Sequence, residues 1–320
     1  MRFRLLLVAL LAGFAGTTAA QPYPTRPIRI VVPQEAAGTV DLVTRYIANR
    51  LEKIMGAAVV VENRSGASGA IGTELVARAA PDGYTLLAAS TNTHAMAPHI
   101  RAAATYDPLR DFVPVVAISY STALFVVAKA LQVRSLRELV AYSLAHPGTV
   151  NYGSAGVGSS NHLMTELFKA QSGADLVHIP YRGNLQSNAA LLAGDVAVVL
   201  TTVSTALPLV QSGNAVALAV IGDRRLDALP DVPTMREAGF PALDIRLWTA
   251  LMAPEGTPRD IVDLLNRNVN RILREPDTMQ WFADRSLAVM GGTPAAFAAT
   301  LRADHALWGA LVRDAGIKPE

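Results

Sequence analysis

Short apolar runs alternate with amphipathic stretches along most of this chain of 320 residues. Residues 28–32 form a β-type apolar run, and residues 41–55 then carry apolar side chains at helical spacing. The same alternation returns further on, where Ser135 and Glu138 form a capping-box pattern that begins another helix. Strands that alternate with helices predict an α/β protein with parallel sheets.

The predicted elements form two α/β units and a helical end. Strands are expected over residues 28–32, 59–61, 85–88, 150–152, 176–179, 196–200 and 216–221. Helices are expected over residues 41–55, 70–80, 135–146, 161–170, 184–192 and 205–211. A third stretch begins with residues 248–253 and continues as helices over residues 258–274, 276–284 and 294–314, with no further strand. Such helices are expected to pack onto an existing lobe.

Two segments connect the units. Residues 113–128 form a long β-rich passage from the first unit to the second, and residues 243–253 form the return passage. Two crossings predict a hinge between ordered lobes, with Trp248 near the return crossing. We expect lobe 1 to contain residues 21–122 and 248–320, and lobe 2 to contain residues 123–247.

The amino-terminal segment has the pattern of a secretory signal peptide over residues 1–20. Arg2 and Arg4 precede an apolar run of about eleven residues, which ends in small residues up to Ala20. This run is shorter than the roughly twenty residues that a membrane-spanning helix needs. The sequence has no cysteine that could carry a lipid anchor. We therefore expect a freely diffusing periplasmic protein after cleavage.

Composition excludes several classes of function. The absence of cysteine excludes disulfides, thiol catalysis and iron–sulfur clusters. Loss of Arg2 and Arg4 leaves 26 of the 28 basic residues, which equals the 26 acidic ones, so nothing indicates a nucleic-acid surface. His94 and His99 are five positions apart and form no metal-binding motif, and no nucleotide-binding signature is present. We expect no metal and no cofactor.

Two loops rich in small residues occupy matching positions in the two units, at residues 33–41 and 153–162. In open α/β sheets, ligands bind beyond the carboxyl ends of the strands, where helix N-termini favour anions. One loop in each unit predicts a clamp around a small ligand. The alternative is that both loops are ordinary strand-to-helix connections with capping residues.

An exported serine hydrolase is the competing function. Ser159 with His162 offers the best nucleophile and base, and Ser154 is a further candidate serine. The G-x-S-x-G elbow of such enzymes is absent from the sequence, so capture without catalysis is the preferred interpretation.

Several ordered motifs resemble those of the Bug receptors, the periplasmic binding proteins of tripartite tricarboxylate transporters. These motifs are VVENRSGASG at residues 60–69, APDGYTLL at 80–87, YGSAG at 152–156, HIPYRG at 178–183 and LPDVPT at 229–234. The resemblance covers almost the whole mature chain. It implies a type II periplasmic binding protein fold and a cleft for a small carboxylate. We expect a monomer whose closed form is recognised by a membrane permease or a sensor kinase.

Carried over by position, the resemblance also implies the ligand-binding residues. In lobe 1 they are Gln34, Glu35, Ala36, Ala37, Gly38, Thr39, Asp41, Ser90, Thr91 and Asn92. In lobe 2 they are Ser154, Ala155, Gly156, Gly158, Ser159, His162, Tyr181, Gly183, Asn184, Thr201 and Thr202.

The chain departs from the family pattern in both loops. Gln34, Glu35 and Ala37 replace an aromatic residue, a small residue and a glycine, and Thr201 stands where the family commonly has an acid. Glu35 either faces the cleft or points to solvent, as most loop carboxylates do. If it faces the cleft, only Arg182 offers a nearby positive charge. We then expect a monocarboxylate, an amino acid, an aromatic acid or an amide as ligand, ahead of a tricarboxylate.

Overall fold

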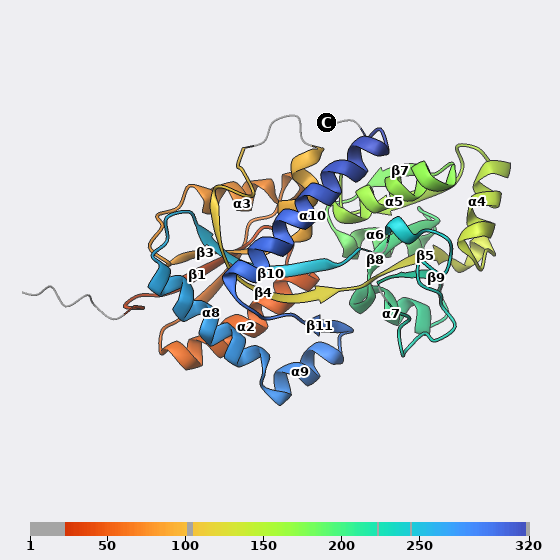
Figure 1. Ribbon diagram of the computed structural model, residues 1–320. Coiled ribbons are helices and arrows are strands. Elements are labelled where there is room, and N and C mark those ends of the chain that lie inside the picture. Colours follow the sequence, from red (N-terminus) through yellow and green to blue (C-terminus); the bar gives the residue numbers. More distant parts are fainter. Residues whose placement is uncertain (1–22, 101–104, 223, 244, 318–320) are drawn as a thin grey trace, which may run out of the picture.

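The computed structural model describes residues 23–100, 105–222, 224–243 and 245–317. The expected signal peptide lies outside these residues. The described chain forms two lobes, each built on one β-sheet with helices packed against it (Figure 1). The sheet of the first lobe has six strands in the order β11-β4-β10-β3-β1-β2, and that of the second has five in the order β7-β6-β8-β5-β9.

The elements follow the predicted alternation closely. The strands are β1 (Ile28–Val32), β2 (Val59–Asn63), β3 (Thr85–Ser90), β4 (Phe112–Ser121), β5 (Ala123–Ala128), β6 (Asn151–Ser154), β7 (Val177–Pro180), β8 (Val198–Thr202), β9 (Ala215–Ile221), β10 (Leu247–Pro254) and β11 (Leu287–Val289). The helices are α2 (Thr39–Met55), α3 (Ala70–Ala77), α4 (Leu136–Ala145), α5 (Ser160–Ser172), α6 (Asn184–Ala193), α7 (Val203–Gln211), α8 (Arg259–Leu273), α9 (Pro276–Ala283) and α10 (Pro294–Asp314). Short helical turns include η1 (Ala67–Gly69), η2 (Asn92–Met96) and η3 (Ala97–His99).

Both sheets are mixed, which corrects the expectation of parallel sheets. Strand β1 pairs in parallel with β2 and β3, whereas β10 is antiparallel to β3 and β4. In the second sheet β6 is parallel to β7 and β8, but β5 is antiparallel to β8 and β9. Strands β5 and β10 enter their sheets from the other lobe, so their direction is set by the crossings and not by a preceding helix.

The long β-rich passage is two strands in two different sheets. Strand β4 completes its pairing in the first sheet at Ser121, Thr122 follows, and β5 begins in the second sheet at Ala123. Strand β10 makes the return, and its residue Leu247 pairs with Ser121. The two crossings therefore lie side by side, as a hinge requires.

The first lobe buries both faces of its sheet. Ile28, Ile30 and Val32 alternate along β1 and pack with residues of α2 and α8, whereas Val31 points to the other face, with α3 and α10. This period of two is what a strand covered on both sides needs. Such burial fixes the end of β1, where the first loop begins.

Helix α10 extends from the first lobe to the second (Figure 1). Its residue Phe297 belongs to the core of the first sheet, while Trp308 and Val312 pack in the core that contains Leu163 and Phe168 of α5. The carboxyl-terminal helix packs against β4 and β10 and therefore joins the lobes in addition to the two strand crossings.

The expectation of no strand in the carboxyl-terminal stretch is wrong. Residues Leu287–Val289 form β11, which pairs antiparallel with the end of β4. Three residues give too short a pattern to recognise, and their strand conformation depends on hydrogen bonds to a distant partner. The capping box of α4 forms in part: Ser135 Oγ accepts the Glu138 N–H at 3.1 Å, but the Glu138 carboxylate accepts from the N–H of Arg134.

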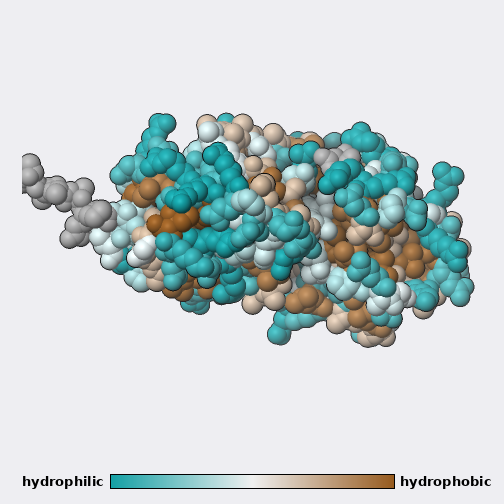
Figure 2. Space-filling model, turned by 90° about the horizontal axis from the view of Figure 1, so that it is seen from below, coloured by the Kyte–Doolittle hydropathy of each residue, from teal (hydrophilic) through white to brown (hydrophobic). Residues whose placement is uncertain are grey.

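Hydrophilic and apolar residues are interspersed on the face of the molecule seen from below, with the larger apolar areas over the second lobe (Figure 2). Among the helices of the described residues, none is long and apolar enough to cross a membrane.

Candidate ligand-binding cleft

A cavity of about 640 Å³ lies between the two lobes. It is bordered by the carboxyl ends of β1, β3 and β6 and by the first turns of α2, α5 and α6. The residues of the predicted site that line it are Gln34, Glu35, Ala36, Gly38, Thr39, Ser90, Thr91, Asn92, Ala155, Gly156, Ser159, Tyr181, Gly183, Asn184 and Thr202. Both predicted loops therefore reach the same space.

Asp41 stabilises the first loop from the side away from the cavity and does not line the cavity. Its carboxylate accepts the Ala37 N–H at 2.9 Å, the Asn63 side-chain amide at 2.9 Å and the Arg45 Nε–H at 3.0 Å. Burial by itself would raise the pKa of Asp41, but the hydrogen bonds from Arg45, Ala37 and Asn63 outweigh it and lower this pKa below its ordinary value. The side chain fixes Ala37, which adopts φ 63° and is turned out of the cavity.

The second loop is held by neutral side chains. Ser159 caps α5: its Oγ accepts the His162 N–H at 3.4 Å and donates to the Gly156 carbonyl at 2.6 Å. Ser154, fully buried, accepts the Gly156 N–H at 3.1 Å and is hydrogen-bonded to His178 Nε2 at 2.6 Å. Burial lowers the pKa of His178 to about 4, helped by its neighbour His162, so His178 is neutral near pH 7.

An asparagine pair connects the second loop to α6. Asn161 accepts the Ala155 N–H at 3.3 Å and donates through its amide to Asn184 Oδ1 at 2.7 Å. Both asparagines line the cavity, although sequence reasoning placed only Asn184 there. The pair sets the spacing between the first turns of α5 and α6.

Six predicted site residues lie outside the cavity lining: Ala37, Asp41, Ser154, Gly158, His162 and Thr201. His162 Nδ1 accepts the Gly158 N–H at 3.1 Å, and its ring stacks on His178. Thr201 is buried beside Thr205, with 2.9 Å between the two hydroxyl oxygens. Successive strand residues face opposite sides of a sheet, so Thr202 reaches the cavity and Thr201 does not.

Sequence reasoning also missed residues on the first wall of the cleft, which is the side formed by lobe 1, and at the hinge. Residues Ser65, Gly66, Ala67, Ser68 and Gly69 line the cavity, as do Ser121, Leu247, Trp248 and Thr249 at the hinge. The motif over residues 60–69 was a family signature without an assigned role. Its left-handed residues Ala67, Ser68 and Gly69 fold the chain back toward the cleft, and such a cluster of small residues was the available signal. No pattern in the sequence indicated that the hinge residues line the cavity.

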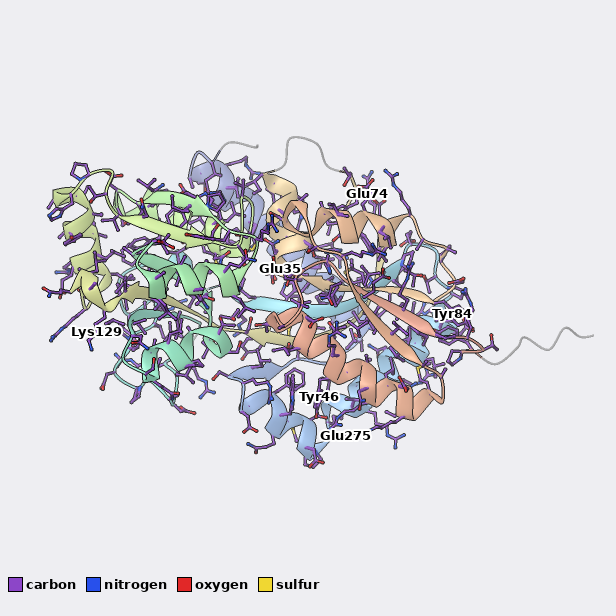
Figure 3. The ribbon with its side chains drawn as sticks, turned by 180° about the vertical axis from the view of Figure 1, so that it is seen from behind. Glu35, Tyr46, Glu74, Tyr84, Lys129 and Glu275 are labelled. Carbon is purple, nitrogen blue, oxygen red and sulfur yellow. The ribbon has the colours of Figure 1, made fainter. Side chains whose placement is uncertain are left out.

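The two lobes contact each other directly across the cleft. Thr39 Oγ1 donates to Thr202 Oγ1 at 3.2 Å and lies 3.3 Å from Ser204 Oγ. Ser68 donates to the carbonyl of Val157. Figure 3 shows Glu35 between the lobes, where it lines the cavity. These contacts describe a closed arrangement.

The charge of the lining is nearly balanced. Among the described residues that line the cavity, Glu35 is the only acidic one and Arg182, which is exposed, the only basic one. The other polar groups are hydroxyls, amides and backbone N–H groups at helix N-termini, which favour an anion without a charged side chain. No group of His, Asp and Glu within the described ranges is arranged to hold a metal ion.

Two lobes, adjacent crossing strands and a cleft at the carboxyl ends of parallel strands define the class of type II periplasmic binding proteins. Residues 43–317 match the family described as Tripartite tricarboxylate transporter family receptor. Protein BugT of Bordetella pertussis (strain Tohama I) is 36% identical over 308 residues, which cover 96% of this chain and 94% of BugT. The chain belongs to this receptor family.

Solved structures agree with this assignment. The periplasmic binding protein BugD is 30% identical with a TM-score of 0.87, covering 93% of this chain and 100% of BugD. An R. palustris protein with adipate is 34% identical with a TM-score of 0.88, covering 93% of this chain and 100% of that one. The chain is a solute-binding receptor and not an enzyme, so the serine hydrolase interpretation is wrong. Ser159 serves as the cap of α5 and His162 packs on His178.

Proposed function

We propose that this receptor captures a small carboxylate or amide-type metabolite between its lobes and presents the closed form to a membrane permease of the tripartite type. The observation that carries the proposal is the cavity itself, which is bordered by the first turns of helices from both lobes. Backbone N–H groups in the first turns of α2 and α5 would hold one carboxylate or carbonyl from two sides, because those of Ala155, Gly156 and Gly158 already donate to side chains of the second loop. The R. palustris relative with adipate supports a carboxylate ligand.

The proposal divides the chain at its crossings. Residues 21–122 and 248–320 would move as lobe 1, and residues 123–247 as lobe 2. The change of sheet around Thr122 supports the first boundary, and the start of β10 at Leu247 supports the second. Residues 1–20 would direct export and be removed, which leaves a monomer in the periplasm.

Closure is the measurable event. A thermal-shift screen of small carboxylates, amino acids and amides should find a stabilising compound, because a ligand at 100 times its dissociation constant adds roughly 2.7 kcal/mol. Small-angle scattering should then show a smaller radius of gyration in the saturated protein. Tryptophan fluorescence should change as well, since Trp248 lines the cavity and its Nε1 donates to Asp304 at 2.7 Å. Identical scattering with and without a bound compound would count against capture by closure.

A further inference from the structure

Glu35 has an unusual position for a loop carboxylate. It lies on the wall of the first lobe, is partly buried, and points between the lobes (Figure 3). Within the described residues, no hydrogen bond or ion pair holds its carboxylate. Other carboxylates of the same lobe are paired: Glu62 with Arg64, Glu74 with Arg78, and Asp41 with Arg45. Glu35 is therefore available to interact with a ligand.

The carboxylate of Glu35 rests against Gly183 of the second lobe. A Cβ atom at Gly183 would lie 2.0 Å from Glu35 Oε2 and 2.6 Å from Glu35 Cδ. The backbone of Gly183 is extended, with φ −172°, so its conformation does not require glycine. The absence of a side chain at Gly183 leaves the space that the Glu35 carboxylate occupies.

Gly183 is also the N-cap of α6, a helix of ten residues. No side chain caps this end, and its first turn contains no acidic residue. A negative charge at a helix N-terminus is favourable, because the free N–H groups carry partial positive charge. Glu35 supplies that charge from the opposite lobe, so the protein itself takes a position that would otherwise attract an anionic group of the ligand.

The electrostatic consequence depends on the charge balance of the cavity. Arg182 is the only basic side chain of the lining among the residues that the structure describes, and it is exposed to solvent. A second negative charge on the ligand would therefore meet Glu35 with little compensation. At a separation of about 5 Å and an effective dielectric constant near 20, that repulsion corresponds to a loss of affinity of about two orders of magnitude. Screening by solvent and salt reduces it, and we expect at least about a tenfold loss.

We propose that Glu35 sets the charge selectivity of the cleft: it occupies the anion position at the start of α6, so that the receptor selects solutes with one carboxylate and an uncharged or cationic donor group at the other end. This inference rests on the proposed capture of a carboxylate. It narrows the substrate class to mono-anions and zwitterions.

Matched pairs of probes test the selectivity directly. Succinate, glutarate and adipate are compared by isothermal titration with their monoamides, which have nearly the same shape and one charge less. The wild-type protein is expected to bind the best monoamide at least about tenfold more tightly than its dicarboxylate. In Glu35→Gln the dicarboxylate should gain about tenfold, while the affinity for the monoamide changes little.

Glu74→Gln is the matched control. Glu74 lies on α3, outside the cavity, and is paired with Arg78 (Figure 3). This variant removes the same charge from the same lobe and should leave the preference for the monoamide unchanged. An equal gain in Glu74→Gln would mean that overall charge, and not the position of Glu35, sets the selectivity, and would overturn the inference.

Two further outcomes would also overturn it, and they differ in what else they contradict. If wild type binds a dicarboxylate as tightly as its monoamide, or if Glu35→Gln leaves the ratio unaltered, the selectivity inference fails while carboxylate capture stands. If no probe of either series binds to any variant, the inference fails, and carboxylate capture fails with it if the thermal-shift screen also finds no stabilising carboxylate.

Discussion

The two walls of the cleft hold their loops by different chemistry. On the first wall, the ionised Asp41 carboxylate accepts hydrogen bonds from the loop N–H of Ala37 and from two neighbouring side chains. On the second wall the supports are neutral: Ser154 with His178, and Asn161 with Asn184. The first wall thus needs a carboxylate to stay ionised, and the second needs an imidazole to stay neutral.

This difference predicts that acid weakens the second wall first. The pKa of Asp41 is lowered, so its stabilisation is present above the ordinary value of about 3.9 and is lost as pH falls through the lower folded value. The pKa of His178 is lowered to about 4, against about 6.5 when unfolded. Between these two values the unfolded state binds more protons, so the stability that depends on His178 declines as pH falls from about 6.5 to about 4.

The largest expected effect is on the free energy of unfolding, through the contact between α3 and the start of the first loop. Gly72 of α3 packs on the start of the first loop, and a Cβ there would lie 2.6 Å from the Arg64 carbonyl oxygen and 2.9 Å from Pro33 Cα. Both are backbone atoms and cannot rotate away. Gly72→Ala should lower the free energy of unfolding by about 1–3 kcal/mol in urea denaturation.

Gly38→Ala is the control for that variant. Gly38 has φ −76°, and its Cβ would meet the Glu35 carbonyl oxygen at 3.5 Å, an ordinary contact. Alanine restricts the unfolded chain more than glycine but is a poorer residue at the N-cap of α2, so the free energy of unfolding should change by less than about 1 kcal/mol. Equal stability of the two variants would show that α3 does not fix the first wall.

The next largest effect is expected on ligand affinity, from a substitution in the loop of the second wall. Gly156 has φ 108°, and a Cβ there would lie 3.3 Å from the carbonyl oxygen of Tyr181. Gly156→Leu should weaken the binding of the best compound from the thermal-shift screen. The loss of binding free energy should exceed the roughly 1 kcal/mol of one hydrogen bond, because the leucine side chain also obstructs closure. Gly148→Leu, at φ 70° with open space around its Cβ, should leave the titrated affinity unchanged. Unchanged affinity in Gly156→Leu would remove the second loop from the binding site.

A smaller effect is expected from pH. The free energy of unfolding should decrease between about pH 7 and pH 5, partly because His178 must take up a proton on unfolding. His94, whose burial lowers its pKa to about 3, acts in the same direction. His178→Gln should therefore reduce the pH dependence without abolishing it. The measurement is urea denaturation of both proteins at the two pH values, and parallel curves would contradict a neutral His178 in the second wall.

The smallest effect tests the contact between the walls. Thr39→Val keeps the shape of the side chain but removes the hydrogen bond to Thr202. The closed form should lose about 0.5–1 kcal/mol, which corresponds to a two- to fivefold weaker affinity with no comparable loss of folding stability. Thr44→Val is unsuitable as a control, because the buried Thr44 hydroxyl donates to the Val40 carbonyl within α2. An unchanged affinity in Thr39→Val would mean that this contact does not stabilise closure.

The sequence alone determined the elements and the type of site. The apolar spacing of residues 41–55 and the small-residue loops near Gly38 and Gly156 were sufficient, because helix periodicity and tight turns depend on neighbours within a few positions. The family motifs added the two-lobed fold, and 15 of the 21 site residues carried over from the resemblance line the cavity.

Only the tertiary structure decided which strand joins which sheet and which loop side chain faces the ligand. The pairing of β4 and β5 in different sheets and the pairing of β11 with β4 depend on hydrogen-bonding partners far along the chain. Asp41 lies behind its loop because three donors surround it there. Thr201 and Thr202 were both expected in the cleft, but only Thr202 lines it, because register sets the face of a strand. Glu35 was left open by the sequence for the same reason: the space that it fills exists only because Gly183, 148 positions further on, belongs to the opposite lobe.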